Sequence, residues 1–481
     1  MLLPFLGFVT GTLLLINAAA LLPPLLIAYT AEEEALLSIT LATAAQTLLG
    51  AVLMRTFGKL QGRLRVRDGF VLVSFTWVVM SLLGAMPLMW GLGMAPLDAL
   101  LESVSGFTTT GATMLTRIEG LPKSILMYRQ EIQWLGGIGM VVSAIALFPK
   151  LGIGGMQLLK AETPGPVKSE KLRPRLKETA RSIIGIYVAI TAACAGAYWL
   201  AGMPAYDAIA HSFSTVSTGG FSTHDDSLGY FDSTAIEVVA MLFMLVGSIN
   251  FSLHYFAFRR AALGVYWNSE EVRALIGVIA VVTALVTLML ASRSDTEGTL
   301  QALRLAGFQV ISVVTSTGFA TANFSTWPLF VPVLLIFISF IGGCAGSTAG
   351  GMKVLRFVVL GRQAAVEIRR LYHPHLVAEV TLGNRVVPAD VVQAVWAYCA
   401  IYVTVFAVTM VILMFDGMDQ VTAFGAIATC LNNLGPGLGE VAQNFSSVSD
   451  AEKWVLCAAM LLGRLELFTI FVLFMPKFWQ D

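Results

Sequence analysis

The chain has 481 residues, of which 57% are hydrophobic and only 12% are charged, and its mean hydropathy is +0.78. Soluble domains carry about 25% charged residues, so this composition excludes a soluble globular protein and indicates a polytopic membrane protein. The formal net charge is zero, so the overall charge carries no information about partners. We expect no nucleic-acid partner. The cysteines have neither metal-ligand nor redox spacing.

Two apolar segments come first, roughly residues 4–28 and 36–54, and each is near the roughly 20 residues that cross a bilayer. Pro23 and Pro24 are expected to kink or end the first segment. A basic stretch follows, from Arg55 to Arg67. Because neither segment is followed by a polar re-entrant loop, we interpret residues 1–68 as an N-terminal two-helix addition.

Four similar units follow, at residues 69–150, 151–260, 261–372 and 373–481. Each has a full apolar span, a shorter apolar run, a polar glycine loop and a second full span. The paired spans are roughly 70–90 and 125–147, 182–201 and 235–258, 274–290 and 329–359, and 391–415 and 454–475. The sequence therefore predicts an all-α polytopic membrane protein, with four pseudo-fourfold repeats of helix, re-entrant pore helix with loop, and helix around a central ion pore.

The short runs predict half-membrane helices. About ten helical residues make only about 15 Å, half of a roughly 30 Å hydrocarbon core, so such a helix must enter and turn back. We expect Asp98 and Asp207, at equal distances before Gly111 and Gly220, to cap the first two helices, and Thr422 to cap the fourth. The partially negative C-terminal ends would face the polar loops and favour a cation there.

The polar loops supply the candidate ion-binding residues. A potassium ion that sheds its water needs oxygen ligands, which inward-pointing carbonyls provide, and glycine permits the dihedral angles this requires. A single Thr-Gly pair is an ordinary turn, so the prediction depends on its recurrence in four units. The predicted K⁺ filter residues are Thr109, Thr110 and Gly111, then Thr218, Gly219 and Gly220, then Ser316, Thr317 and Gly318, and finally Asn433, Leu434 and Gly435.

The four loops are similar but not equivalent. Non-helical backbone at membrane depth is tolerated only where protein or water covers it, so we expect the loops to enclose one water-filled path together. The fourth loop lacks hydroxyl groups and has Pro436 after its glycine. We therefore expect weaker selectivity than a strictly repeated filter would give.

A second candidate feature interrupts the last span of the third unit. Five glycines within ten residues make a poor helix, so we expect a flexible intramembrane loop that lies across the pore under the filter. The alternative is a helix-packing face of small residues. The residues concerned are Gly342, Gly343, Gly346, Ser347, Thr348, Gly350 and Gly351.

Charged residues also lie within the last span. Arg464 is about ten residues into it, near mid-membrane, where a charge is costly and usually functional. It is expected to bond carbonyls of the glycine-rich loop or to hinder cations with its charge. Glu466, two residues on, would face elsewhere on the same helix, and the alternative is a structural ion pair with another unit. Gln133 and Trp134 are interpreted as packing residues.

The histidines His211 and His224 flank the second polar loop. A histidine there titrates near neutral pH. We nevertheless expect both to have hydrogen-bonded packing roles.

Basic residues set the expected orientation. They lie in the segments between units, at 55–67, 150–181, 259–260 and 356–385, whereas the opposite side carries acidic residues. The positive-inside rule then places the basic segments in the cytoplasm and opens the glycine loops outward. Acidic side chains around the outer mouth would concentrate cations. These residues are Asp225, Asp226, Asp232, Asp416, Asp419, Glu440 and Asp450.

The loops at residues 108–113, 217–223, 315–319 and 432–439 resemble those of the Trk/Ktr/HKT potassium transporter superfamily. The chain is similar to the bacterial TrkH-type members of this superfamily from end to end, including the first two spans. Residues 152–157, 164–168 and 342–348 strengthen the resemblance. Thr218 is a departure, since the family has an aliphatic residue there.

This resemblance implies potassium uptake across the bacterial inner membrane, with the loops facing the periplasm and K⁺ as the bound ion. It implies a homodimer in lipid, with one pore in each protomer, and a gate formed by residues 342–351 and Arg464. It also implies a cytosolic TrkA-type ring that binds nucleotides and NAD, so we expect no covalent cofactor on this chain. Residues 160–181 and 356–370 are candidate contacts for that ring.

Two other functions were weighed. A proton- or sodium-coupled cation symporter on the same scaffold is the main alternative, although secondary transporters are typically built from inverted repeats and these four units run in one direction. An intramembrane enzyme would need a base or a metal site, and the chain has no His-Glu-x-x-His motif. We therefore expect a channel-like transport protein and no catalysis.

Overall fold

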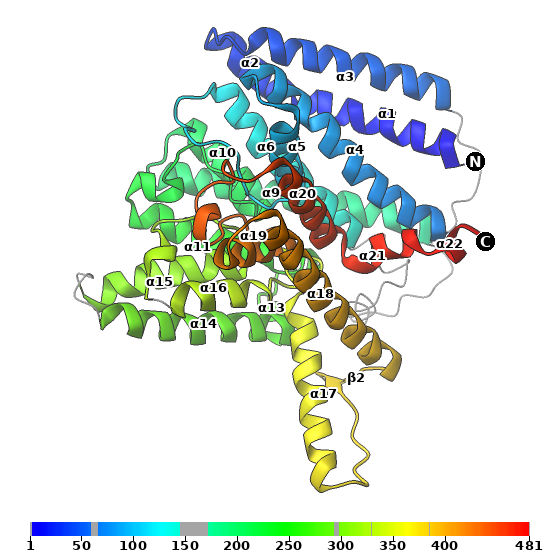
Figure 1. Ribbon diagram of the computed structural model, residues 1–481, viewed down its shortest axis with the longest axis vertical. Helices are drawn as coiled ribbons and strands as arrows, with labels where there is room; N and C mark the ends of the chain where they lie inside the picture. Colours follow the sequence, from blue (N-terminus) through cyan, green and yellow to red (C-terminus); the bar gives the residue numbers. More distant parts are fainter. Residues whose placement is uncertain are drawn as a thin grey trace.

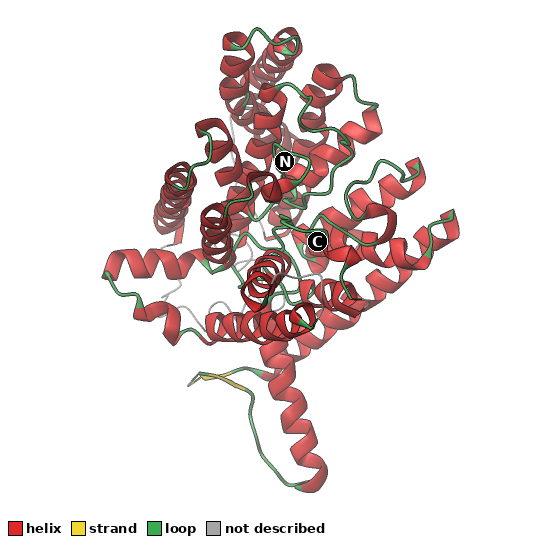
Figure 2. Cartoon of the chain, turned by 90° about the vertical axis from the view of Figure 1, so that its left-hand side faces the viewer, coloured by secondary structure: helices red, strands yellow, loops and turns green. Residues whose placement is uncertain are grey.

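The computed structural model describes residues 2–58, 66–144, 172–292, 298–328, 330–383 and 385–480. Within these ranges the chain is almost entirely helical, and one short antiparallel pair joins β1 (Thr381–Leu382) to β2 (Arg385–Val386). The helices pack into one body, from which α17 (Val354–Tyr372) projects (Figure 1). Seen after a 90° turn, loop segments run through the middle of the helical body (Figure 2).

Among the described residues, six helical segments are long and apolar enough to cross a membrane: Pro4–Thr30, Leu36–Phe57, Arg67–Leu92, Ala180–Leu200, Glu270–Ala291 and Ala389–Asp416. Two bent pairs qualify as further spans. The first joins α11 (Thr234–Ser248) to α12 (Phe251–Arg260) at 100°, and the second joins Asp450–Leu465 to Leu467–Phe474 at 108°. Apolar side chains such as Val281, Leu288 and Val403 are exposed on these segments, as expected where lipid replaces water.

The N-terminal pair is a close helix hairpin. Helix α1 (Leu2–Ala20) packs on α3 (Leu36–Phe57), and the backbones approach so closely at Gly11 and Gly50 that a Cβ on either glycine would lie 2.9 Å from the carbonyl oxygen of the other. The chain breaks at Leu21, just before the two prolines, and α2 (Leu22–Thr30) follows. Proline is tolerated in the first turn of a helix, so the predicted interruption lies at the start of α2.

Four short helices precede the polar loops: α5 (Pro96–Phe107), α10 (Ala205–Ser217), α15 (Thr299–Val314) and α19 (Gln420–Asn432). With 12 to 16 residues, they are too short to cross a bilayer. Each ends directly before its loop, as predicted.

The predicted caps of these helices were wrong. Helices α5 and α10 begin after Ala95 and Pro204, so Asp98 and Asp207 lie in the first turn instead. Their carboxylates have other partners, because Asp98 pairs with Lys453 at 2.6 Å and Asp207 accepts from Thr223 at 2.7 Å. In the fourth unit the cap is Asp419 and not Thr422. Hydrogen bonds from Thr422 lower the pKa of the exposed Asp419 carboxyl.

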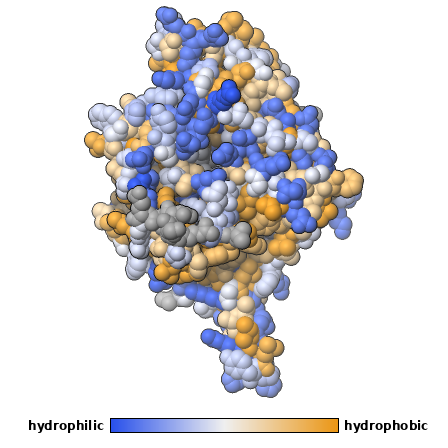
Figure 3. All heavy atoms as spheres, turned by 60° about the vertical axis from the view of Figure 1, so that its left-hand side comes forward, coloured by the Kyte–Doolittle hydropathy of each residue, from blue (hydrophilic) through white to orange (hydrophobic). Residues whose placement is uncertain are grey.

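The other helices complete the body around the loops. They are α4 (Val66–Leu92), α6 (Lys123–Val142), α9 (Leu172–Leu200), α13 (Gly264–Asn268), α14 (Glu270–Ala291), α16 (Phe330–Ser339), α18 (Ala389–Asp416), α20 (Asp450–Leu465), α21 (Leu467–Phe471) and α22 (Pro476–Gln480). Single 3₁₀ turns lie at η2 (Ser227–Phe231), η3 (Phe324–Thr326), η4 (Gly439–Val441) and η5 (Val472–Phe474). The space-filling view, coloured by the hydropathy of each residue, shows hydrophobic residues exposed on the surface beside hydrophilic ones (Figure 3).

Candidate functional site

The four polar loops share one backbone conformation. The first residue of each predicted trio is left-handed, with φ of 52° at Thr109, 53° at Thr218, 51° at Ser316 and 53° at Asn433. The third residue is a glycine with φ of 83° at Gly111, 80° at Gly220, 82° at Gly318 and 97° at Gly435. Left-handed residues at alternate positions turn successive carbonyls toward one side of the chain, and glycine adopts this conformation without strain. The fourth loop therefore has the geometry of the other three despite its different sequence.

The four loops also close into a ring. A Cβ added to Gly111 would lie under 3.0 Å from the carbonyl oxygen of Gly219 in the second loop, and a Cβ on Gly435 would come similarly close to Thr110 in the first. In the same way, Gly220 of the second loop meets Thr317 of the third, and Gly318 of the third loop meets Leu434 of the fourth. The contacts thus pass from loop to loop and return to the start. Real Cβ atoms do not come so close, so the packing of each loop on the next requires glycine.

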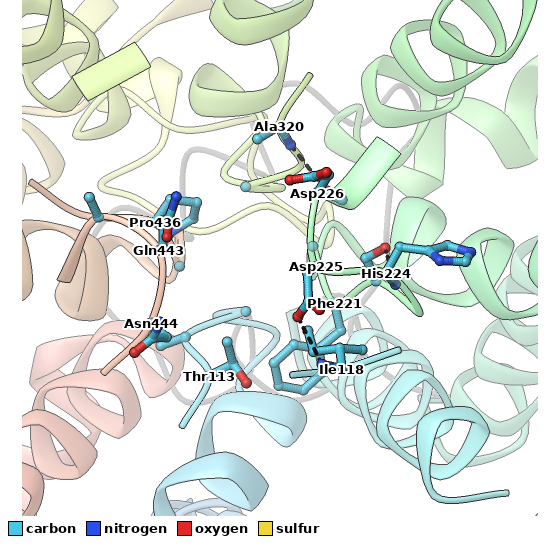
Figure 4. Close-up of a pocket in the computed structure, with 18 of the residues that line it drawn as sticks. Thr113, Ile118, Phe221, His224, Asp225, Asp226, Ala320, Pro436, Gln443 and Asn444 are labelled. Carbon is cyan, nitrogen blue, oxygen red and sulfur yellow. Dashed lines mark hydrogen bonds between the residues drawn. The ribbon is translucent and has the colours of Figure 1, made fainter. Parts of the chain in front are cut away.

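A cavity of about 440 Å³ lies against this ring. Its lining includes all four of the ring glycines, Gly111, Gly220, Gly318 and Gly435, and residues from each of the four units. Figure 4 shows that side chains from loops far apart in sequence converge here, among them Thr113, Asp225, Pro436 and Asn444. The ring is therefore open to the outside of the molecule through one shared mouth.

The charged residues of the mouth are Asp225, Asp226 and Arg129. Asp225 accepts a 2.8 Å hydrogen bond from the backbone N–H of Ile118, whereas the charge of Arg129 is balanced by a buried carboxylate described below. An acidic lining raises the local concentration of cations. Of the seven acidic residues predicted for this side, only these two aspartates line the cavity.

The hydroxyl groups of the loops brace them rather than fill the path. Thr108 and Thr110 share a 2.7 Å hydrogen bond in the first loop, and Thr315 and Thr317 share an equal one in the third. Asn433 performs this role between loops, since its amide donates to Thr110 Oγ1 at 2.9 Å. Side chains therefore brace the ring within and between its loops.

Gln133, interpreted from the sequence as a packing residue, bonds directly to the second loop. Its Nε2 donates to the carbonyl of Gly219 at 2.6 Å, and its Oε1 accepts from the N–H of Phe221 at 3.1 Å. These bonds hold the second loop on both sides of Gly220. Trp134, whose indole donates to Thr191 at 3.0 Å, is a packing residue as expected.

A buried ion pair between Glu102 and Arg129 was also missed. Both side chains are fully buried, with 2.7 Å between Arg129 Nη2 and Glu102 Oε1. Glu102 also accepts from the N–H of Met114 at 2.8 Å, just after the first ring trio, and Arg129 lies 4.2 Å from the ring centre of Phe221, just after the second. The pair therefore joins two adjacent loops. A charge at membrane depth was the signal for it.

Residues 340–353 form a non-helical loop that lies beneath the ring. Cys344 N donates to the carbonyl of Ser248 at 2.8 Å, Gly351 N donates to Asn432 at 3.1 Å, and Gly350 N donates to Ser316 Oγ at 2.5 Å. The loop thus touches the second, third and fourth units. The prediction of a loop, and not of a helix-packing face, agrees with this geometry, and Gly342, Gly346 and Gly351 all have positive φ.

Thr348 connects the underlying loop to the second unit. Its hydroxyl lies 2.9 Å from the carbonyl of Gly247, and it accepts from Thr218 Oγ1 at 3.2 Å. The hydroxyl of Thr218 therefore contributes a contact to this loop that an aliphatic side chain would lack.

The arginine of the last span reaches the same loop. Arg464 is buried, donates to the carbonyl of Thr348 at 2.7 Å and also reaches the carbonyl of Gly136 at 3.4 Å. This is the predicted bond to the glycine-rich loop. Lys353, a second buried cation that the sequence reasoning missed, donates to the carbonyl of Ala349.

Glu466 does not lie on the same helix as Arg464, which corrects the prediction. Helix α20 ends at Leu465, and Glu466 has a φ of 59° at the 108° bend. Its carboxylate forms a buried 2.5 Å ion pair with Arg356, whose guanidinium lies 3.9 Å from the ring centre of Tyr398. The bond to the glycine-rich loop is therefore made by Arg464, whereas the structural ion pair with another unit is made by Glu466.

The two histidines differ in environment. His211 is buried and bonded through both ring nitrogens, to Asp207 O and to Ser222 Oγ, each at 2.9 Å. His224 instead lines the cavity, stacked 3.6 Å from the ring centre of Tyr230 and within 3.6 Å of Glu119 and Asp207. The packing role expected for both therefore describes His211 better than His224.

Part of the surface that we predicted to contact a TrkA-type partner lies outside the described residues. Residues 145–171 lie outside the described ranges, and with them the motifs at 152–157 and 164–168 and much of the basic stretch 160–181. Of the second basic stretch, 356–370, Arg356 is buried in its ion pair and is therefore no surface contact, whereas Arg369 and Arg370 are exposed.

Comparison with known proteins identifies a family. The TrkH family, described as cation transport protein, matches residues 36–481. Trk system potassium uptake protein TrkH of Salmonella typhimurium is 45% identical over 475 residues and covers 98% of both chains. The Vibrio parahaemolyticus protein of the same name is 46% identical over 479 residues, again covering 98% of both.

Solved structures agree. The crystal structure of the potassium transporter TrkH from Vibrio parahaemolyticus superimposes with a TM-score of 0.92 at 43% identity and covers all of both chains. The all-α polytopic membrane fold predicted from the sequence is confirmed by this match. The relatives are named as transporters rather than enzymes, which agrees with the expectation of transport without catalysis. The chain belongs to the TrkH family of cation transport proteins.

Proposed function

We propose that this chain takes up potassium ions across a bacterial inner membrane, through the ring formed by its four glycine loops. The observation that carries the proposal is the closed cycle of contacts from Gly111 to Gly219, Gly220 to Thr317, Gly318 to Leu434 and Gly435 to Thr110. The names of the relatives, potassium uptake proteins, supply the ion.

The ring has the properties that a cation filter needs. Carbonyls on its inner side replace the water that the ion sheds. The C-terminal ends of α5, α10, α15 and α19 are directed at the ring, and each contributes a partial negative charge. Asp225 and Asp226 in the mouth attract cations before they enter. Because three kinds of negative field act along one path, cations are admitted and anions are rejected.

We further propose that residues 342–351 and Arg464 form the gate. The bond from Arg464 to the carbonyl of Thr348 holds the loop beneath the ring and brings a positive charge beside the path. The loop is held by hydrogen bonds to neighbouring units rather than by helical hydrogen bonds of its own, and its glycines adapt to other dihedral angles, so it can move without unwinding a helix. A cytosolic TrkA-type ring that binds nucleotides is the proposed source of the force that moves it, through the exposed basic end of α17.

The active assembly is proposed to be a homodimer with one path in each protomer. Helix α17 projects from the body in both ribbon views (Figures 1 and 2). Large apolar side chains are exposed at its end and in the segment that follows, with Leu371 84% and Val377 93% exposed. An apolar surface of this kind is typical of a protein interface.

The experiment is growth at low potassium of a bacterium that lacks its own potassium uptake systems. The chain is expressed alone and with a TrkA-type partner. We expect rescue that Gly318→Asp and Gly318→Ala both abolish, because any Cβ there meets the carbonyl of Leu434. Gly277→Ala is the matched control, since a Cβ on Gly277 of α14 has no atom within 4 Å.

The outcomes separate the candidate functions. Rescue that persists in Gly318→Ala would place the path elsewhere. Rescue that depends on external pH or sodium, with the ring variants inactive, would favour the coupled symporter. No rescue by protein that is present in the membrane would exclude potassium uptake.

A further inference from the structure

A second cavity lies in the second unit, and none of the ring residues lines it. Its volume is about 1,060 Å³, slightly above the roughly 300–1,000 Å³ of small-molecule pockets. One wall is a single face of α9, formed by Ser182, Gly185, Ile186, Ala189, Ile190 and Ala193. The opposite wall comes from α11, α12 and α13. We refer to this cavity as the α9 groove.

The sequence explains why a groove forms here. Three of the α9 residues that face it are glycine or alanine, Gly185, Ala189 and Ala193, so little side chain projects into the space. On the other side, the chain bends by 100° between α11 and α12. The remaining wall is apolar and aromatic, including Phe243 and Phe258. The groove therefore accepts a long, flexible apolar group.

The position of the groove is that of a membrane interface. Helix α12 is bent across the direction of its span and has a buried apolar side and an exposed end, the arrangement of an interfacial helix. Tyr266 lines the groove, and the next residue, Trp267, is 68% exposed. Tyrosine and tryptophan are enriched where the acyl chains of a bilayer meet its headgroups.

Positive charge gathers at one end of the groove. Arg259 and Arg260 lie between two groove-lining residues, Phe258 and Ala261. On the opposite wall, Arg181 directly precedes Ser182, which also lines the groove. All three arginines are exposed. None of them forms an ion pair within the described ranges; Arg259 donates to Tyr255, and Arg260 lies 5.5 Å from the ring centre of Phe256. An apolar groove with an uncompensated basic end matches a molecule that has an apolar tail and an anionic head.

We propose that the α9 groove binds an anionic phospholipid, with one acyl chain between α9 and α12 and the phosphate headgroup at Arg181, Arg259 and Arg260. Burial of the acyl chain supplies non-specific affinity. The basic end distinguishes an anionic lipid from a zwitterionic one, because each basic side chain attracts anionic headgroups. This site is separate from the ion path and does not depend on its assignment.

Native mass spectrometry of the purified full-length chain tests the proposal, with phosphatidylglycerol and phosphatidylcholine of identical acyl chains as probes. We expect one tightly held phosphatidylglycerol per chain and at least tenfold weaker binding of phosphatidylcholine. In Arg259→Gln/Arg260→Gln, phosphatidylglycerol should bind about 25-fold more weakly, since each basic group near the surface contributes roughly fivefold. Phosphatidylcholine binding should stay the same.

The chain offers a matched pair of variants for the acyl groove. A Cβ on Gly185 or on Gly196, both on α9, has no atom within 4 Å, but only Gly185 lines the groove. Gly185→Leu should therefore fill the groove and remove the bound lipid, whereas Gly196→Leu should retain it. Equal affinity for both lipids would overturn the proposal, as would equal loss in both leucine variants. A change of oligomeric mass in Gly185→Leu, with no change in lipid number, would assign the groove to a second copy of the chain instead.

Discussion

At the four ring glycines, the space for a methyl group is unequal. A Cβ added to Gly435 would lie 2.7 Å from the nearest carbonyl oxygen, whereas a Cβ on Gly111, Gly220 or Gly318 would come closer. We predict that alanine at any of these three lowers uptake by at least a hundredfold, and that Gly435→Ala is the mildest of the four. Uptake of rubidium by cells that depend on the chain measures this order. Equal loss in all four would show that φ, and not the carbonyl contact, limits substitution.

The Glu102–Arg129 pair gives a second prediction at this scale. Removal of one partner from a buried ion pair destabilises a protein by about 3–5 kcal/mol, because the other charge is left without compensation. Glu102→Gln should therefore lower the thermal unfolding temperature of the detergent-purified protein strongly. Glu102→Gln/Arg129→Met should regain much of the loss. If the double variant is less stable than either single variant, the pair is not the unit that holds the two loops.

The sequence identified those loop residues whose chemistry recurs in all four units. The twelve ring residues were found because a hydroxyl or amide group and a glycine recur in four units, and their shared φ angles agree with that alignment. Gln133 and Arg129 occur once each, on α6, so no repeat marked them. Their roles depend on which loop carbonyl or carboxylate lies opposite in space, which a single sequence does not specify.

Among the larger elements, the loop at residues 340–353 gives a prediction about gating. Hydrogen bonds from charged groups contribute roughly 1.5–3 kcal/mol, so loss of the bond from Arg464 to Thr348 shifts the balance between closed and open loop by about tenfold or more. Arg464→Gln should therefore raise potassium flux in proteoliposomes that contain no partner ring.

A lysine variant separates the two roles of this arginine. Arg464→Lys keeps the positive charge but loses the geometry that reaches Thr348 and Gly136 together. High flux in the lysine variant identifies the hydrogen bonds as the closing force. If flux through the lysine variant is as low as through the unchanged chain, the positive charge itself is the closing force. If flux through the glutamine variant is low as well, Arg464 is not part of the gate.

Helix boundaries were harder to predict than helices. The short helices were recognised from their length and position, but Asp98 and Asp207 were mistaken for caps, because a carboxylate near a helix start serves equally in the first turn, next to Lys453 or Thr223. The bend at Glu466 was missed altogether. Gly463 lies three residues before it but within the helix, and the ion pair with Arg356 that accompanies the bend is formed by a residue 110 positions earlier.

For the molecule as a whole, the projecting α17 leads to a prediction about assembly. If its apolar end is the contact between protomers, Leu371→Glu places two like charges in that contact and should convert a dimer to a monomer. Mass photometry of the purified chain measures the change. Leu300→Glu is a suitable control, because Leu300 is 81% exposed at the start of α15. A dimer that survives Leu371→Glu would place the interface elsewhere.

The architecture was predictable because the bilayer restricts the choices. Span length, charge distribution and the need to cover non-helical backbone together indicated a polytopic fold with four inward loops, and the match to a solved family structure confirms the fold. The direction of α17 was not predictable. The sequence showed an apolar span that continues into basic residues, and only the packing of the loop at 340–353 determines where the chain emerges.

The contact between Gly435 and Thr110 joins the last unit to the first, and this has a consequence for biosynthesis. A ribosome makes the N-terminal units first, so three of the four loops exist before the residues that complete the circle have been translated. A nascent or prematurely terminated chain lacks one side of the ring. If the ring is the ion path proposed above, the order of the units along the message delays ion permeability until almost the whole polypeptide has been made, and unfinished copies would not discharge the membrane potential.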